Sequence, residues 1–158
     1  MARCGARALR ACARRRGREH VVIDTLYVLY DARCGICSRV RAWMQQQPAY
    51  VALAFVAAGS ERARRLFPDL DHDADPRELV VITNEGAVYV DDAAWLLCLW
   101  ALADYRTWAF RFARGPLRPL ARVAWQLLSE NRRELARILA LRSDEEVARE
   151  LERQPETC

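Results

Sequence analysis

Two cysteines three positions apart are the residues whose spacing most directly suggests chemistry in this chain. Cys34 and Cys37 follow the apolar run 26–30, which predicts a buried β-strand, and they begin a stretch whose apolar residues recur at helical spacing. Two thiols at a strand-to-helix junction are typical of a reversible dithiol–disulfide couple. Within a regular helix, Cβ atoms at i and i+3 lie about 5–6 Å apart, whereas a disulfide needs about 3.5–4.5 Å. The pair can therefore close only at the helix start.

The predicted junction also favours a reactive thiolate. The free N–H groups and partial positive charge of a helix N-terminus stabilise an anion, and in CxxC motifs the thiol pKa falls from about 8.5 to about 3.5–7.5. We expect Cys34 to be the solvent-exposed nucleophile and Arg33 to favour its anion further. Cys37 shares the inward side of the helix with Val40 and Met44, so we expect it to be the shielded resolving thiol.

The other cysteines do not extend this pair into a disulfide framework. Cys4 and Cys12 lie in an arginine-rich leader, Cys98 lies in an apolar helical run where packing explains it, and Cys158 is the last residue. Such scattering suits a reducing compartment, and we predict a cytoplasmic protein. Half of a zinc site and a pair of inert cysteines remain alternatives for the CxxC, but a redox pair needs no metal or organic cofactor.

Length and charge predict one folded domain with two basic segments, which are residues 1–20 and 105–142. The chain has 158 residues, of which 53% are hydrophobic and 29% charged, as in globular proteins. Residues 1–20 are rich in arginine, lack the apolar core of a secretory signal, and are expected to be a disordered leader. Residues 21–142 form the predicted α/β domain with its helical layer, and 143–158 form a charged helix and tail.

The order of predicted elements indicates a three-layer α/β fold. Strands are expected at 26–30, 51–56, 79–82 and 87–90, and helices at 35–47, 60–67, 93–102, 105–114, 117–128, 131–141 and 144–153. Ser143 and Glu146 form a capping box at the start of the last helix. A strand–helix–strand unit, a hairpin and a covering helix predict a central mixed sheet of about four strands, the thioredoxin-like outline, with a C-terminal helical extension.

Two further patterns have simpler explanations. His72 lies among Asp69, Asp71, Asp73 and Asp75, but a calcium loop starting at Asp69 would have Ala74 and Val80 where Gly and Glu are required, so a solvated loop is favoured and no metal is expected. In residues 105–142 the arginines alternate with Trp108, Phe110, Phe112 and Trp125. We expect an amphipathic layer with its aromatic residues against the sheet. Nucleic acid is not an expected partner, and an anionic membrane surface is possible but not favoured.

On these residues the chain resembles the DCC family of predicted thiol-disulfide oxidoreductases. The resemblance rests on Tyr30-Asp31 at the strand end, on Cys34 and Cys37, on the hairpin 86–89, and on the segment 128–132. It covers about residues 26–133 and implies a thioredoxin-like fold, protein-disulfide redox activity, and site residues Tyr30, Asp31, Cys34 and Cys37.

The chain departs from the family pattern at several positions. It has Ala32-Arg33 where Gly-Asp is usual, Gly35 where proline is common before Ile36, and Asp91 or Asp92 where a glycine is expected. Thioredoxins carry a cis-proline directly before their third strand, whereas Pro76 here stands three residues before Leu79. We therefore expect a different platform for substrate or weaker peptide binding.

Asp31 has two compatible roles at this stage. It can accept the proton of Cys37 or orient a water that does so, and it can cap the helix start by accepting N–H groups near Arg33 or Cys34. An ionised carboxylate opposes thiolate formation, so Asp31 is not simply an activator.

Two functions follow from the sequence. The first is thiol-disulfide exchange with a disulfide-containing protein or small-thiol substrate, with Cys34 attacking and Cys37 resolving. The second is a non-catalytic thioredoxin-like module that binds a partner or an anionic surface through the basic helical layer 105–142.

Overall fold

The computed structural model describes residues 22–72, 79–114 and 118–153. The arginine-rich leader, Cys4, Cys12, Cys158, Pro76 and the aspartates at 73 and 75 lie outside these residues, and so do the expectations that concern them.

A four-stranded mixed sheet forms the centre of the molecule. Its strands are β1 (Thr25–Tyr30), β2 (Ala52–Ala57), β3 (Val80–Thr83) and β4 (Val88–Val90), in the order β2-β1-β3-β4. β1 and β2 are parallel and are joined through helix α1 (Gly35–Gln45), whereas β3 pairs antiparallel with both β1 and β4. This β-α-β unit followed by a hairpin confirms the thioredoxin-like α/β fold.

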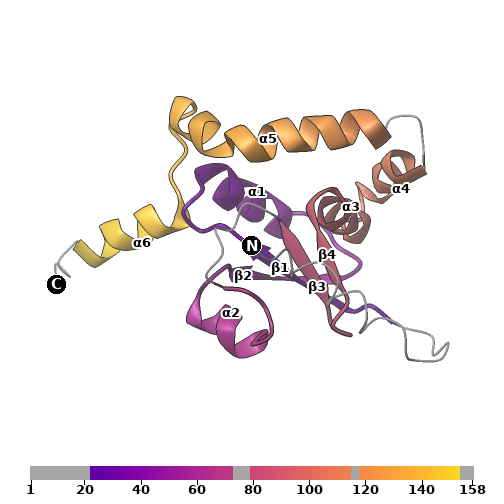
Figure 1. Ribbon diagram of the computed structural model, residues 1–158, viewed down its shortest axis with the longest axis horizontal. Coiled ribbons are helices and arrows are strands. Elements are labelled where there is room, and N and C mark those ends of the chain that lie inside the picture. Colours follow the sequence, from indigo (N-terminus) through magenta and orange to yellow (C-terminus); the bar gives the residue numbers. More distant parts are fainter. Residues whose placement is uncertain (1–21, 73–78, 115–117, 154–158) are drawn as a thin grey trace, which may run out of the picture.

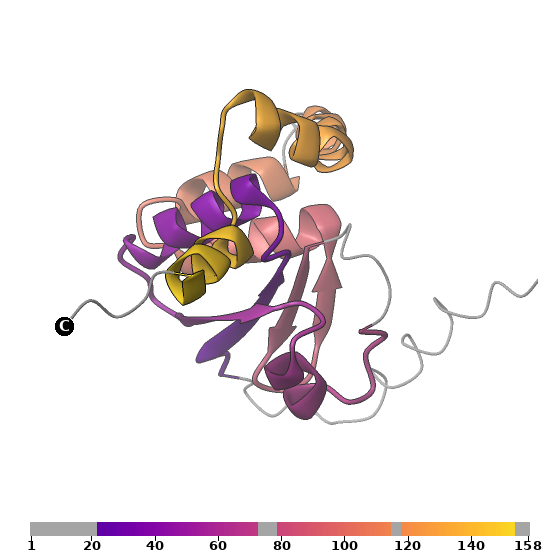
Figure 2. The same ribbon diagram turned by 90° about the vertical axis from the view of Figure 1, so that its left-hand side faces the viewer.

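Helices lie on both sides of this sheet, as Figures 1 and 2 show. α1 and α3 (Asp91–Ala101) cover one face, and the short α2 (Glu61–Leu66) lies on the other side. The core between the sheet, α1 and α3 is apolar because alternate residues of β1 and β3 point into it. Fully or almost fully buried members are Leu26, Val28, Met44, Val81 and Cys98.

The junction between β4 and α3 explains one departure from the family pattern. Asp91 has φ = 52°, in the left-handed region, and its N–H donates to the carbonyl O of Leu79 at 3.0 Å. Glycine adopts this conformation without steric cost, and Asp is among the few other residues that tolerate it. The backbone at Asp91 therefore has the conformation that explains the family's glycine at this place.

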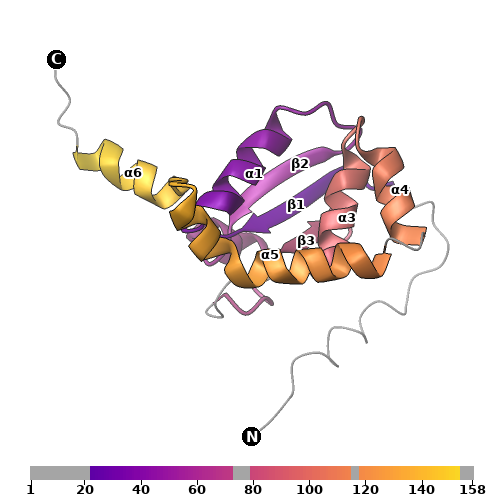
Figure 3. The same ribbon diagram turned by 90° about the horizontal axis from the view of Figure 1, so that it is seen from above.

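The C-terminal helical extension differs from the expected pair of helices. α4 (Arg106–Arg114) is followed by one continuous helix α5 (Arg118–Ile138), so the prediction of separate helices at 117–128 and 131–141 was wrong. No Gly or Pro follows Pro119 of the first turn within this helix, and the Asn131 side chain donates to the Leu127 carbonyl one turn back, at 2.9 Å, within the helix. α5 crosses over α1 and α3 (Figure 3).

The aromatic residues of this extension do not all face inward. Trp125 stacks on Trp95 of α3 with ring centroids 5.6 Å apart, as expected for an inward-facing layer. Trp108 and Phe110 are instead 48% and 46% exposed, so the expectation fails for this part of α4, where the Arg111 guanidinium lies over the Trp108 ring.

A turn after α5 leads into the last helix, α6 (Asp144–Arg153), which extends away from the body in Figures 1 and 3. Ala140 has φ = 49°, and the N–H of Leu141 donates to the carbonyl of Ala136, which closes a Schellman-type turn. The capping box is confirmed: Ser143 N–H donates to Glu146 Oε2 at 2.8 Å, and Glu146 N–H donates to Ser143 Oγ at 3.2 Å. Within the described residues, no helix is long and apolar enough to cross a membrane.

Candidate active site

The end of β1 and the first turn of α1 place the cysteine pair. Cys34 is the N-cap of α1: its backbone is extended, and its Sγ accepts the N–H of Cys37 at 3.3 Å. A turn closed by the Cys34 N–H and the Asp31 carbonyl (3.1 Å) connects the strand to this helix. The expected position of the pair at the helix start is therefore observed.

The two sulfur atoms face each other directly. They lie 2.8 Å apart as free thiols, and the Cys37 S–H donates to Cys34 Sγ. A disulfide needs about 2.05 Å between the sulfurs. Only a small movement of either side chain therefore separates the reduced pair from a bonded one.

This contact drives the pKa values of the pair in opposite directions. The S–H group of Cys37 lowers the pKa of Cys34 to about 6, against burial and the Asp31 carboxylate, which raise it, and the Cys37 N–H and Arg132 lower it further. Donating that proton raises the pKa of Cys37 far above the usual range, and burial adds to the effect. The contact therefore favours a thiolate on Cys34 and a thiol on Cys37.

Asp31 anchors the start of the site by both side-chain oxygens. Its Oδ1 accepts the backbone N–H of Arg33 at 3.0 Å, which is the predicted capping contact. Its Oδ2 lies 3.3 Å from Nη2 of Arg132 and 3.7 Å from Nη2 of Arg133, and the residue is 3% exposed. The Arg33 side chain is largely exposed, with its Nε 3.7 Å from Asp31 Oδ1.

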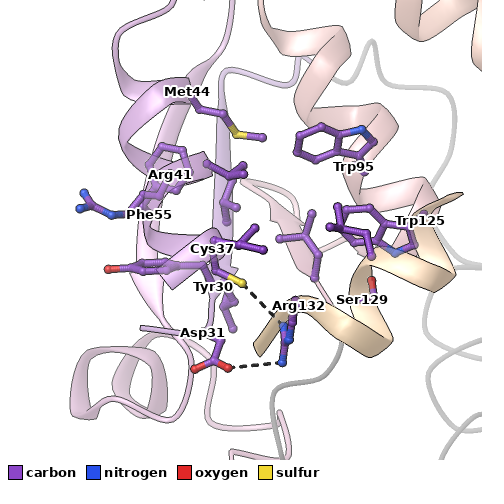
Figure 4. Close-up of a pocket in the computed structure, with 16 residues that line it drawn as sticks. Tyr30, Asp31, Cys37, Arg41, Met44, Phe55, Trp95, Trp125, Ser129 and Arg132 are labelled. Atoms are coloured by element: carbon purple, nitrogen blue, oxygen red, sulfur yellow. Dashed lines mark hydrogen bonds and ion pairs between the residues drawn. The ribbon is translucent and has the colours of Figure 1, made fainter. Parts of the chain in front are cut away.

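Arg132 belongs to the site, although no pattern in the sequence predicted a role for it. Its Nη1 lies 3.7 Å from Cys37 Sγ while Nη2 contacts Asp31, so one guanidinium bridges the carboxylate and the resolving sulfur (Figure 4). Its positive charge lowers the pKa of both cysteines. The sequence signal for Arg132 was its place in segment 128–132, which resembles the family. Its partners Asp31 and Cys37 are found only in the structure, where α5 packs against α1.

The expectation that Cys34 is exposed was wrong, because Cys34 is only 1% exposed. Residues 139–145, here called the strap, run from the end of α5 into α6 across the first turn of α1. A Cβ on Gly35 would overlap the carbonyl oxygen of Leu141, so the strap approaches this helix as closely as a glycine allows. Proline at the first position of a helix is normally well tolerated. The strap therefore explains why the position usually held by proline carries glycine.

Hydrogen bonds donated by two backbone N–H groups fix the strap to residues on both sides of Cys34. The Glu145 N–H donates to the carbonyl of Ala32 at 3.1 Å, and the Asp144 N–H donates to Ser38 Oγ at 3.0 Å. Ser38 is itself buried. The strap is thus held to residues before and after the buried Cys34.

The Asp144 side chain adds a polar cluster to the strap. Its Oδ2 accepts the hydroxyl of Tyr30 at 2.8 Å, and its Oδ1 accepts Nη2 of Arg41 at 3.0 Å. Burial and this carboxylate together raise the pKa of Tyr30 to about 12, while Arg41 acts in the opposite direction. Tyr30, expected as a site residue, therefore holds the strap through its hydroxyl.

On the other side of the pair, Cys37 borders an apolar cavity of about 90 Å³ between β1, α1, α3 and α5. Figure 4 shows Asp31, Cys37 and Arg132 at one end of this cavity and Met44 and Trp95 at the other. Ile36, expected to support the site, also lines it, and Cys34 does not. Its apolar walls include Val28, Val40, Met44, Trp95, Trp125 and Leu128.

The remaining sequence candidates lie apart from this centre or take structural roles. His72 Nε2 lies 2.7 Å from the Phe67 carbonyl O. Cys98 is fully buried in α3, and burial raises its pKa to about 12. Among the described residues, no three His, Cys, Asp or Glu side chains gather as metal ligands do.

A thioredoxin-like sheet with two facing thiols at the start of its first helix defines a protein of the thioredoxin-like redox class. The family model for DCC1-like thiol-disulfide oxidoreductases matches residues 28–138, most of the chain. The chain therefore belongs to the DCC1-like thiol-disulfide oxidoreductase family. Comparison with curated proteins and with solved structures gave no match.

Proposed function

We propose that this protein exchanges disulfides with protein substrates through Cys34 as nucleophile and Cys37 as resolving thiol. The observation that carries the proposal is the contact between the two sulfurs, 2.8 Å apart at a helix N-terminus with opposite pKa shifts. Such a pair has one thiolate that can attack a disulfide and one thiol that can afterwards resolve the mixed disulfide. No metal or organic cofactor takes part in the proposed exchange.

In the first step the Cys34 thiolate attacks one sulfur of the substrate disulfide. A bond forms between Cys34 and that sulfur, the substrate S–S bond breaks, and the other substrate sulfur leaves as a thiolate. In the second step Cys37 attacks Cys34 Sγ, the mixed disulfide breaks, and the second substrate thiolate leaves. The protein pair is oxidised to a disulfide, and the substrate disulfide is reduced to two thiols.

Cys37 must lose its proton before the second step. Once Cys34 is in a mixed disulfide it no longer carries the charge that holds this proton, and Arg132, 3.7 Å from Cys37 Sγ, favours the new thiolate. We assign the proton to Asp31, directly or through a water, because its Oδ2 is held against the same guanidinium.

Access to Cys34 requires the strap to move. A side chain that is 1% exposed cannot reach a disulfide on another protein, and residues 139–145 pack against Ala32, Gly35 and Ser38 on either side of it. The strap depends on polar contacts rather than on a large apolar interface. Opening it is a local change that leaves the sheet intact.

Single cysteine variants test the proposal. Cys34→Ser should abolish reduction of a protein disulfide such as that of insulin, whereas Cys37→Ser should accumulate a mixed disulfide, identified by mass spectrometry. Cys98→Ala is the matched control, because this thiol is buried in α3. If Cys34→Ser retains the activity of the unmodified protein, or if Cys37→Ser traps no partner, the proposal is wrong.

A further inference from the structure

We propose that the cavity beside Cys37 binds a branched aliphatic group next to the sulfur of the substrate, and so selects disulfides that carry such a group. This inference rests on the proposed function and names its substrate class. It concerns the side of the cysteine pair that the strap leaves free.

The composition of the cavity wall determines what kind of group binds there. Five elements (β1, α1, β2, α3 and α5) contribute apolar side chains, among them Val40 from α1, Trp95 from α3 and Leu128 from α5. Three charged residues belong to the lining: Asp31 and Arg132 contact each other at the end that holds Cys37, and Arg41 is paired with Asp144. Polar atoms elsewhere in the lining include the Ser129 hydroxyl and Nε1 of Trp125, so a charged substituent placed among the apolar residues would lose its hydration without gaining a charged partner.

The size of the cavity limits the group further. A volume of about 90 Å³ is several times what one water needs and below the ~150 Å³ of a cavity known to hold benzene. A group of three to five carbons, such as the side chain of Val or Leu, matches this space better than an aromatic ring or a segment of polypeptide.

The position of the cavity connects binding to the reaction. Cys37 borders the cavity, whereas the nucleophile Cys34 does not. In the mixed disulfide the substrate sulfur is bonded to Cys34 Sγ, which lies 2.8 Å from Cys37 Sγ in the reduced pair. A substituent in the cavity therefore holds the substrate against the resolving thiol and restricts its motion during both steps.

Three mixed disulfides with a common 2-pyridyl leaving group test the inference on the reduced full chain: isobutyl, 2-hydroxyethyl and benzyl. Release of pyridine-2-thione gives the second-order rate constant for each. Burial of the isobutyl group should make its rate constant about 10-fold or more higher than that of the hydroxyethyl probe. Each probe needs the same access to Cys34, so the ratio of rate constants reports on the cavity.

A cavity-filling variant connects the preference to this site. Ser129 lines the cavity from α5, and Ser129→Leu should reduce the ratio of the isobutyl to the hydroxyethyl rate constant to less than about threefold. Gln126→Leu, at an exposed position of the same helix, is the matched control and should keep the preference. Peptide disulfides with Leu or Ser beside the cysteine then show whether the group belongs to a polypeptide or to a small thiol.

The outcomes separate this inference from the proposed function. If all three probes react at one rate, if benzyl is preferred, or if Ser129→Leu keeps the preference, the inference is wrong and the oxidoreductase proposal stands. If no probe reacts faster with the protein than with its Cys34→Ser variant, the proposed function itself fails.

Discussion

The strap side and the cavity side of the cysteine pair differ in almost every physical respect. On the strap side, Cys34 is buried, and the strap contacts its neighbours Gly35 and Ser38 through backbone and polar groups. On the cavity side, Cys37 borders an apolar space between helices. The two sulfurs are nevertheless in direct contact.

This difference suggests a division of roles. The strap side holds the charged sulfur and keeps solvent and unrelated disulfides away from it. The cavity side contains no strongly nucleophilic group in the resting state, because the Cys37 pKa is raised by its contact with Cys34 and by burial. As proposed, Cys34 supplies the reactive sulfur and the cavity beside Cys37 recognises the substrate. Variants can therefore alter reactivity without altering recognition, or the reverse.

The largest effect is expected from Asp31→Asn, which removes the proposed proton acceptor of the cavity side. Release of the substrate thiol from the mixed disulfide should slow by about 100-fold, a loss typical of general bases. Stability should fall by only about 1–2 kcal/mol, since Asn still accepts the Arg33 N–H while Arg132 loses its anion. Stopped-flow kinetics and denaturant unfolding measure the two effects.

Faster release of the substrate thiol in Asp31→Asn would have a different physical cause. The Asp31 carboxylate raises the pKa of both cysteines by its charge. If charge alone mattered, Asp31→Asn would make Cys37 easier to deprotonate, and release of the substrate thiol would be faster. Faster release would exclude Asp31 as the proton acceptor.

The next largest effect is expected from Gly35→Ala, which acts on the strap side. The new Cβ overlaps the Leu141 carbonyl and should displace the strap, at a cost of about 1–3 kcal/mol. Alkylation of Cys34 by iodoacetamide, followed by mass spectrometry, should accelerate by about 10-fold. Gly86→Ala is the control, because its Cβ would meet nothing within 4 Å, and its φ of 84° makes alanine unfavourable there for a backbone reason that does not involve the strap. Equal acceleration in both variants would mean that the strap does not limit access.

Cys37→Ala should remove the direct contact between the two sulfurs, in which the Cys37 S–H donates to Cys34 Sγ. The pKa of Cys34, about 6 in the intact pair, should rise toward its ordinary value of 9.0. Thiolate absorbance as a function of pH measures this midpoint independently of access, and Cys98→Ala serves as the control. An unchanged midpoint would show that the helix start and Arg132 are sufficient to ionise Cys34.

The same pKa shift predicts how stability depends on pH. Because folding depresses the Cys34 pKa, the reduced protein gains stability as pH rises from about 6 to about 9 and loses it as pH falls through about 6. In Cys37→Ala this gain should shrink. Urea unfolding of the reduced protein across that range compares the two slopes.

The smallest effect is expected from Asp144→Ala, which removes side-chain contacts of the strap but leaves its backbone contacts. Losing the partners Tyr30 and Arg41 should cost about 1 kcal/mol and raise the Cys34 alkylation rate about fivefold. The pKa of Tyr30, now about 12, should fall. Glu145→Ala is the control, because its carboxylate pairs with Arg149 within α6. A lower alkylation rate in Asp144→Ala would contradict this role.

Local signals in the sequence were sufficient for the sheet and for the start of the site. Apolar runs and the CxxC spacing located β1 and the first turn of α1, and the Ser143–Glu146 pair located the start of α6. The proposed break near residue 129 failed because no residue there prevents a helix from continuing.

The burial of Cys34 and the role of Arg132 depend on contacts between distant segments. Asp144 and Ser38 are 106 positions apart, and Arg132 and Cys37 are 95 apart. Neither Leu141 nor Arg132 carries a local pattern that names its partner. Such contacts follow from how α5 crosses α1, which the sequence pattern alone does not determine.

The close approach of Leu141 to Gly35 also constrains how this protein can be redesigned. Residues between the two cysteines are a natural target for tuning a redox potential, and proline would be an obvious replacement here. In this chain any side chain at that position meets a segment more than 100 residues later. An engineer who alters the motif must therefore rebuild the C-terminal end with it, since the two parts of the polypeptide act as one unit.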